Sequence, residues 1–300
     1  MRPLEHQRTK IKRVIKHLPE LITDKAKILQ QAGIDQAKAE VESILCHLLD
    51  TDRMHLYLDG SRLLSNSTLT ELDRIIQQRA SRYPLQYILG EAWFYGRKFY
   101  VSPTVIVPTP ETEVLCETAL GFVREKQMSK PRILDLGVGA GVIAVTLAGE
   151  LPDCTVLGVD ISQPAIEVAQ RNARELRVVD KIEFRQSDFF TSVAERERFD
   201  LIVSNPPYVS EKEYPTLPPE VLAEPQIALL AGQNGMDAIK IIVREAPKYL
   251  ARGGRIMLEI GHRQAAAITK MTEKDDRYTS IAIIKDLNDI DRVVILSCSE

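Results

Sequence analysis

Apolar residues recur every three to four positions through roughly the first ninety residues, which is the spacing of amphipathic helices. The pattern is interrupted at Gly33, around Asp59-Gly60 and at Ser65-Asn66-Ser67, where Ser67 is in position to cap the following helix. It ends before Pro84, because the residue preceding a proline disfavours helical geometry. We therefore predict a small helical bundle over residues 1–90, in which residues 1–18 form a basic extension.

A different pattern begins after residue 90. Residues 91–107 open with an aromatic, strand-like run in which Gly96 is placed for a tight turn, and this predicts a β-hairpin linker. From Arg132 onward, short apolar runs alternate with helical patterns, which predicts a mainly parallel sheet with helices on both faces. The expected fold is α/β, with a Rossmann-like domain of seven strands over residues 108–300. The strands are expected at residues 133–136, 155–159, 182–186, 199–204, 255–260, 280–285 and 293–297.

The first strand of this domain runs into a glycine-rich turn. Ile133-Leu134-Asp135-Leu136 is followed by Gly137-Val138-Gly139-Ala140-Gly141 and then by an apolar helix. A strand, a glycine-rich turn and a helix form the first unit of a nucleotide-binding fold, in which the helix N-terminus favours an anionic group. The spacing is G-x-G-x-G and not the dinucleotide pattern, and the acid in the strand is more typical of S-adenosylmethionine (SAM) sites. The candidate cofactor residues here are Asp135, Gly137, Val138, Gly139, Ala140 and Gly141.

Two further acids stand at predicted strand ends. Asp160 lies about twenty residues beyond the glycines, where a ribose-binding carboxylate is expected, and Ile161 beside it joins the candidate set. Asp188-Phe189 follows the next strand, so that an acid and an aromatic ring are available for an adenine. Ligands of such sheets bind beyond the carboxyl ends of the strands. One cofactor site would therefore include residues that are far apart in the chain.

The strand at residues 199–204 ends in the tetrapeptide Asn205-Pro206-Pro207-Tyr208. It resembles the signature of methyltransferases that alkylate a planar nitrogen, which is a poor nucleophile and must be held in place. Asn205, before a proline, favours extended geometry. Its side-chain oxygen and the Pro206 carbonyl are suited to accept both N–H bonds of a substrate amide, and Tyr208 offers an aromatic wall. We predict all four residues as the catalytic set, with Asn205 also beside the cofactor.

Bulk properties exclude several classes of protein. The chain has 300 residues and a formal net charge of −3, whereas proteins that coat nucleic acid are strongly basic. No apolar stretch approaches the roughly 18 residues of a membrane span, and the basic start lacks the apolar core of a secretory signal. The four cysteines are scattered along the chain, as is typical of reduced thiols in the cytosol. The sequence contains no Cys/His cluster of the kind that would predict a metal site. We expect a monomeric, cytoplasmic protein without a membrane partner, a nucleic-acid substrate or a metal.

These motifs, in this order, resemble the bacterial peptide chain release factor N5-glutamine methyltransferase family over nearly all of the chain after the basic extension. The resemblance implies transfer of a methyl group from SAM to the side-chain amide nitrogen of a glutamine. That glutamine belongs to the Gly-Gly-Gln motif of class-1 peptide chain release factors, the implied partners, which the N-terminal helical domain helps to hold. The segments that carry the resemblance are Pro84-Leu85-Gln86-Tyr87-Ile88-Leu89-Gly90, Pro108-Thr109-Pro110-Glu111-Thr112-Glu113, Asp135-Leu136-Gly137, Asp160-Ile161-Ser162, Asn205-Pro206-Pro207-Tyr208 and Glu259-Ile260-Gly261-His262.

The chain departs from the family pattern at three positions. Thr109 stands where the family usually has arginine, so any charge-based role of that arginine is absent or supplied elsewhere. Val138 and Ala140 replace small hydroxyl residues that are common in the glycine-rich turn. Backbone contacts to a cofactor survive these two changes, whereas side-chain contacts do not.

Other functions share the same tetrapeptide. An N6-adenine methyltransferase of DNA would extrude its base into the same pocket, but the acidic balance and the lack of a basic recognition domain argue against it. A related branch methylates a glutamine of a ribosomal protein, which Ala92-Trp93-Phe94 faintly resembles, while Pro110-Glu111-Thr112-Glu113 favours the release-factor branch. A non-catalytic scaffold would need neither the glycine turn nor the tetrapeptide.

Overall fold

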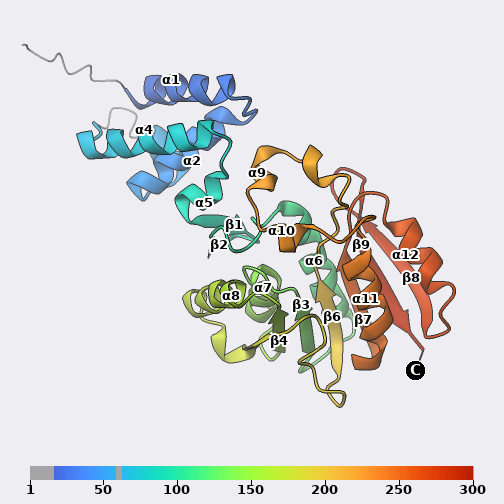
Figure 1. The fold of residues 1–300 in the computed structure, drawn as a ribbon. Coiled ribbons are helices and arrows are strands. Elements are labelled where there is room, and N and C mark those ends of the chain that lie inside the picture. The colour runs from blue at the N-terminus through green and yellow to red at the C-terminus, as the bar shows by residue number, and fades with distance from the viewer. Residues whose placement is uncertain (1–16, 59–62, 300) are drawn as a thin grey trace, which may run out of the picture. The chain divides into compact units, whose positions relative to one another are not determined.

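The computed structural model describes residues 17–58 and 63–299, and the chain divides into two compact units, Met1–Leu89 and Gly90–Glu300 (Figure 1). Two features expected from the sequence fall outside the described residues. These are nearly all of the basic extension, up to residue 16, and the helix break at Asp59-Gly60.

The first unit is helical. Its helices enclose one apolar core, to which Leu29, Ile44 and Ile76 contribute fully buried side chains. The last long helix begins at Asn66 and is capped by Ser65, whose side-chain oxygen accepts a hydrogen bond from the Thr68 N–H at 3.1 Å. The expectation that Ser67 is the cap is wrong, because the helix starts earlier and Ser67 lies in its first turn. The helices are α1 Leu18–Gln31, α2 Ala37–Leu49, α3 Arg53–Leu58, α4 Asn66–Ala80 and α5 Leu85–Leu89.

The second unit opens with the predicted hairpin, formed by β1 (Glu91–Phe94) and β2 (Arg97–Tyr100). Its turn is Tyr95-Gly96, with φ of 49° and 69°, the paired positive angles that match the twist of a two-residue hairpin. Phe94 and Phe99 meet edge to face, 6.1 Å between ring centroids, inside the core of the second unit. The hairpin is therefore an integral part of this unit, whereas the sequence suggested a linker.

The α/β fold with its seven-stranded, mainly parallel sheet is confirmed. The strand order is β5-β4-β3-β6-β7-β9-β8, with the first five strands parallel and β9 antiparallel to both of its neighbours. Only β7 differs much from its predicted range, beginning at Leu250, because Leu250 pairs with Phe199 before the register shifts and the next pair is Leu201 with Arg255, which leaves the extra residues on β7. The strands are β3 Arg132–Leu136, β4 Thr155–Asp160, β5 Ile182–Gln186, β6 Phe199–Ser204, β7 Leu250–Glu259, β8 Tyr278–Lys285 and β9 Asp291–Cys298.

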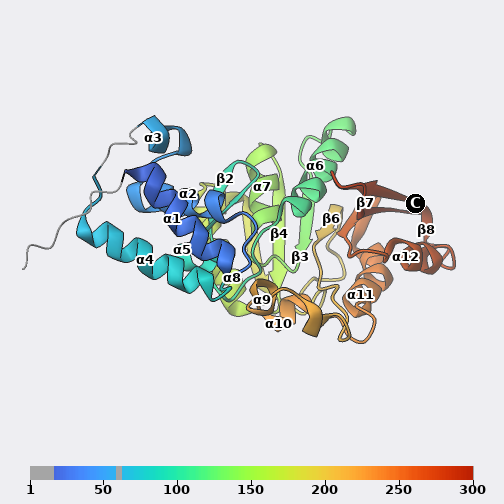
Figure 2. The ribbon, with the colours of Figure 1, turned by 90° about the horizontal axis from the view of Figure 1, so that it is seen from above.

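Helices cover both faces of the sheet (Figure 2). Successive side chains of a strand point to opposite faces, so both of the neighbouring residues Ile133 and Leu134 are buried, each in a different apolar layer. The layer around Ile133 includes α6, α7 and α8, and the layer around Leu134 includes α11 and α12. This two-sided burial explains why the strands are continuous apolar runs. The helices are α6 Pro110–Glu125, α7 Val142–Glu150, α8 Gln163–Glu175, α9 Pro219–Leu222, α10 Gln226–Leu229, α11 Asp237–Glu245 and α12 Ala265–Thr272.

Candidate functional site

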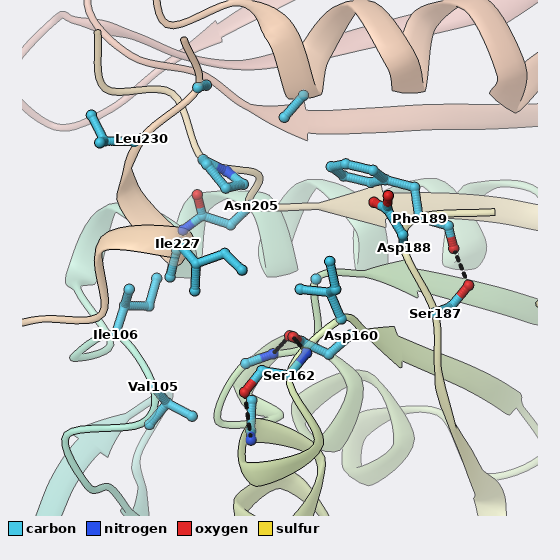
Figure 3. A pocket seen from close by; sticks show the side chains of 18 of the residues that line it. Val105, Ile106, Asp160, Ser162, Ser187, Asp188, Phe189, Asn205, Ile227 and Leu230 are labelled. Atoms are coloured by element: carbon cyan, nitrogen blue, oxygen red, sulfur yellow. Dashed lines mark hydrogen bonds between the residues drawn. The ribbon is translucent and has the colours of Figure 1, made fainter. Parts of the chain in front are cut away.

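A pocket of about 370 Å³ lies in the second unit at the carboxyl ends of the parallel strands (Figure 3). This is the edge at which open α/β sheets bind ligands, and the volume is within the usual range for small-molecule sites. The motifs that follow β3, β4, β5 and β6 all contribute to its wall. The predicted residues that line the pocket are Gly137, Gly139, Asp160, Ile161, Asp188, Phe189, Asn205 and Pro207.

The glycine-rich turn is held against β4 by its backbone. The N–H groups of Gly137 and Val138 both donate to the carbonyl of Val159, at 2.8 and 2.9 Å. Gly137, Gly139 and Gly141 have φ of 74°, 53° and 81°, which residues with a side chain rarely adopt. A Cβ on Gly141 would also lie 3.0 Å from the Cβ of Ala169 in α8. The glycines therefore serve both a left-handed backbone and close packing of α7 on α8.

Asp160 connects this turn to the next loop. One carboxylate oxygen accepts the N–H of Gly139 at 2.9 Å, and the other accepts the N–H of Ser162 at 2.8 Å. Burial raises the pKa of Asp160, while these backbone N–H groups act in the opposite direction. Each carboxylate oxygen retains a further lone pair. The side chain is thus rigidly placed at the pocket wall and still able to accept a hydrogen bond from a ligand.

The loop after β5 presents Asp188 and Phe189. Ser187 organises it, because its N–H donates to the Asp160 carbonyl at 2.8 Å and its hydroxyl donates to the Phe189 carbonyl at 2.9 Å. Phe189 has a φ of 47°, an uncommon conformation for an aromatic residue. Local strain of this kind is concentrated at ligand sites. Here it directs the chain so that Asp188 and Phe189 both reach the pocket (Figure 3).

Asn205 takes part in a buried hydrogen-bond chain. Its side-chain Nδ2 donates to the Thr112 hydroxyl at 3.1 Å, and that hydroxyl donates to Oε2 of Glu259 at 2.7 Å. Thr112 is in the first turn of α6 and Glu259 is the last residue of β7. Burial raises the pKa of Glu259 to about 7, although the bond from Thr112 and the charge of Arg292 lower it.

The rest of the tetrapeptide is only partly in the wall. Pro207 lines the pocket, whereas Pro206 and Tyr208 do not. The Tyr208 ring lies so close to Gly261 that a Cβ there would be 2.9 Å from the ring, and burial raises the pKa of the Tyr208 hydroxyl. Tyr208 is half-buried and packs against Gly261, and the contact of its ring with a substrate amide stays a prediction.

Four predicted cofactor residues lie behind the lining. Asp135 is fully buried and accepts the N–H of Ala144 in α7 at 3.1 Å, and burial raises the pKa of Asp135 to about 7. Val138 packs in the core, and the Ala140 carbonyl accepts a bond from the side chain of Asn172 at 2.8 Å. With Gly141, these residues shape the turn without contributing side chains to the pocket wall. The exposed Thr109 is also outside the lining.

One side of the pocket was missed from the sequence. Val105, Ile106, Ile227 and Leu230 all line the pocket, and Figure 3 draws each of them on the side of Asn205 away from Asp188 and Phe189. The Glu224 carboxyl accepts a hydrogen bond from the Val107 N–H and so connects the two segments, and burial raises the pKa of Glu224 to about 7. Isolated apolar residues in loops carry no local signal of binding, so only tertiary packing reveals them.

Some classes of site receive no support from the described part of the chain. Residues 17–58 and 63–299 contain no group of three or more His, Cys, Asp or Glu side chains that could hold a metal ion. Among the described helices, none has the length and apolar character required to cross a bilayer. The four cysteines are all free thiols.

Comparison with known proteins gives consistent results for both parts of the chain. Residues 20–90 match the family described as the PrmC N-terminal domain, and residues 127–294 match a methyltransferase domain. Among solved structures, the hMettl16 catalytic domain has a TM-score of 0.55, with 14% identity over 81% of this chain and 86% of that chain. A T. thermophilus 16S rRNA methyltransferase has a TM-score of 0.50, with 19% identity over 70% of this chain and 50% of that chain. At these identities the structural likeness establishes the fold alone.

Three curated proteins named release factor glutamine methyltransferase align over almost the full chain. The protein of Nitratidesulfovibrio vulgaris is 37% identical over 89% of this chain and 90% of its own length. Those of Cereibacter sphaeroides and Geobacter sulfurreducens are each 39% identical over 89% of this chain, and over 93% and 91% of their own lengths. The chain therefore belongs to the release factor glutamine methyltransferase family.

Proposed function

We propose that this chain transfers a methyl group from SAM to the side-chain amide nitrogen (N5) of the glutamine in the Gly-Gly-Gln motif of class-1 peptide chain release factors. The family assignment supports this substrate. The proposed chemistry rests on the side-chain amide of Asn205. This residue lines the pocket, and its Nδ2 donates a hydrogen bond to the Thr112 hydroxyl. Its oxygen is then left to accept an N–H bond from an amide substrate.

The residues of the pocket fit SAM as the methyl donor. We assign the backbone at Gly137 and Gly139 to the methionine part, because positive φ angles let a ligand approach the main chain closely. Asp160 is suited to the ribose hydroxyls, and Asp188 with Phe189 to the adenine. When bound, SAM supplies a methyl group activated by its sulfonium, which even a weak nitrogen nucleophile can attack.

We assign the apolar side of the pocket to the glutamine. Val105, Ile106, Ile227 and Leu230 line the pocket and are suited to the methylene groups of that side chain. We assign its two amide N–H bonds to the side-chain oxygen of Asn205, which also lines the pocket, and to the main-chain carbonyl of the adjacent Pro206, which lies outside the lining. Such positioning lowers the barrier by up to roughly 7–11 kcal/mol in favourable systems. The two acceptors also face a nitrogen on which positive charge develops. No strong base is required before attack, because the amide nitrogen becomes acidic only as it is alkylated.

We further propose a division of labour along the chain. Residues 1–90 hold the release factor and residues 108–300 carry out the transfer, a division supported by the separate family matches of the two regions. We propose a monomer that acts in the cytoplasm, where translation factors are found. Hydrogen exchange of the full chain with and without the release factor would test the first assignment. Protection confined to residues 90–300 would contradict it, and light scattering would test the monomer.

The decisive experiment is mass spectrometry of a class-1 release factor after incubation with the purified chain and labelled SAM. We expect one methyl group on the Gly-Gly-Gln glutamine, and none with Asn205→Ala. Ribosomal proteins and duplex DNA should be incubated in parallel. Label on a ribosomal protein would keep the mechanism and change the substrate, whereas label on DNA would overturn the assignment of a protein substrate.

A further inference from the structure

We propose that Thr112 and Glu259 are positioning residues that fix the direction of the Asn205 amide, so that its oxygen and not its nitrogen faces the substrate. This inference deepens the proposed function and rests on it. The hydrogen bonds join three elements: the end of β6, the first turn of α6 and the end of β7. Thr112 and Glu259 are 93 and 54 residues away from Asn205 in the chain, so only the fold brings them together.

The direction of the bonds follows from the donors and acceptors available. An ionised carboxylate can only accept hydrogen bonds, so the Thr112 hydroxyl spends its single hydrogen on Oε2 of Glu259, 2.7 Å away. The hydroxyl oxygen can then only accept from Asn205. The group 3.1 Å away must therefore be the amide nitrogen. Ionised Glu259 thus determines, through Thr112 and through its own interaction with the Asn205 side chain, which end of a nearly symmetric amide is turned away from the pocket.

The burial of these groups argues for a role beyond packing. Thr112 and Glu259 are only 3% and 1% exposed, and a buried carboxylate costs folding energy unless it is well paired. The positive charge of Arg292, on β9, attracts the Glu259 carboxylate. The guanidinium of Arg292, however, donates a hydrogen bond to Asp286, at 2.9 Å. Glu111 of α6 adds repulsion. The Glu259 carboxylate therefore depends on the neutral donors Thr112 and Asn205. If these buried side chains served only packing, an apolar pair of similar size would fill the same space with a smaller loss of folding free energy.

A reversed Asn205 amide would be unproductive. Its Nδ2 would then point toward the N–H groups of the substrate amide, placing donor against donor. Each productive contact would become a repulsive one, while binding of the cofactor through Gly139 and Asp160 would be unaffected. The hydrogen-bonded chain Asn205–Thr112–Glu259, here called the relay, should therefore influence the rate of methyl transfer and not the affinity for SAM.

The test compares three variants of the full chain. Thr112→Val keeps the shape but removes the hydroxyl, Thr112→Ser restores the hydroxyl, and Thr146→Val is the control at another buried threonine, in α7 and outside the pocket wall. We expect kcat on a class-1 release factor to fall by about 10- to 100-fold in Thr112→Val. Thr112→Ser should keep most of the wild-type rate, Thr146→Val should match wild type, and the Kd for SAM should change less than about twofold in all three.

A second readout does not depend on the substrate. The side-chain amide signals of Asn205 can be assigned in a ¹⁵N–¹H spectrum by their loss in Asn205→Asp. We expect slow solvent exchange of these protons in wild type and Thr112→Ser, and fast exchange in Thr112→Val. If wild type methylates no release factor, the proposed function fails and the exchange rates still test the relay. Wild-type exchange rates in Thr112→Val, or a kcat within twofold of wild type, would overturn the inference.

Discussion

Gln264 donates from its side-chain Nε2 to the main-chain oxygen of Tyr208 at 3.1 Å, across 56 residues of sequence. The same nitrogen donates to the carbonyl of Gly235 at 2.8 Å, and Oε1 accepts the N–H of Gly261 at 2.8 Å. A Cβ on Gly235, whose φ is 68°, would lie 2.3 Å from the Tyr208 oxygen. One buried amide therefore holds three backbone segments together directly behind the Asn-Pro-Pro-Tyr turn.

The substitution Gln264→Glu should destabilise the second unit. An ionised carboxylate still accepts the Gly261 N–H but loses both donations, and it faces two carbonyl oxygens in a buried position. We expect a loss of about 2–4 kcal/mol in unfolding free energy by urea denaturation, together with a lower kcat, because the Asn205 turn is no longer braced. The control is Gln77→Glu on the exposed face of α4, expected to change stability by less than about 0.5 kcal/mol. Equal effects of the two substitutions would refute the bracing role of Gln264.

Removal of the Asn205 amide should stop methyl transfer. Asn205→Ala deletes the acceptor for the substrate and leaves the Thr112 hydroxyl without its donor, while the glycine turn and Asp160 are unchanged. We expect loss of nearly all activity with a SAM Kd that stays within about twofold of wild type. Calorimetry and single-turnover kinetics would measure the two quantities. Retention of more than half of the wild-type rate would contradict the assigned role.

Asp160→Ala should instead weaken the binding of SAM, the quantity that Asn205→Ala leaves nearly unchanged. It removes the carboxylate that orients the Gly139 N–H and faces the pocket, so the cofactor loses a hydrogen-bonding partner and the turn loses its brace. We expect the Kd for SAM to rise by about 10- to 100-fold, since each lost charge-assisted hydrogen bond is worth roughly 1.5–3 kcal/mol. The matched control is Asp153→Ala, at an exposed position before β4. An unchanged cofactor Kd by calorimetry would refute the assignment.

The sequence predicted those parts of the site whose signals are local. Gly137, Asp160 and Asn205 each directly follow or end an apolar strand, and a parallel sheet brings such positions to one edge. The contacts of Thr112 with Glu259 span 147 residues, so they depend on how α6 packs against β7. The ring position of Tyr208 likewise depends on Gly261, 53 residues further along the chain, and not on its own neighbours. Long-range packing of ordinary residues leaves no motif to recognise.

Glu259 should give the activity a characteristic dependence on pH. Its pKa of about 7 lies above the ordinary value because burial disfavours the charged form, although Thr112, Arg292 and Asn205 favour it. Above pH 7 the carboxylate accepts the Thr112 hydroxyl proton and keeps the Asn205 amide correctly turned. Below pH 7 the protonated carboxyl can donate to Thr112, and the direction of the relay is lost. We therefore expect kcat to fall as the pH decreases through about 7.

The variant Glu259→Gln separates this effect from other titrating groups, because its amide does not titrate and can both donate and accept at every pH, as the protonated carboxyl of Glu259 can. We expect the acid limb of the kcat profile to disappear in the variant. Stability should change in the opposite sense, because a carboxyl with a raised folded-state pKa binds its proton more tightly in the folded protein. Relative to the variant, the unfolding free energy of wild type should therefore decrease as pH rises from 4.5 to about 7, with a slope of up to about 1.4 kcal/mol per pH unit. Identical acid limbs in the two proteins would show that another group controls the rate, and would remove Glu259 from the relay.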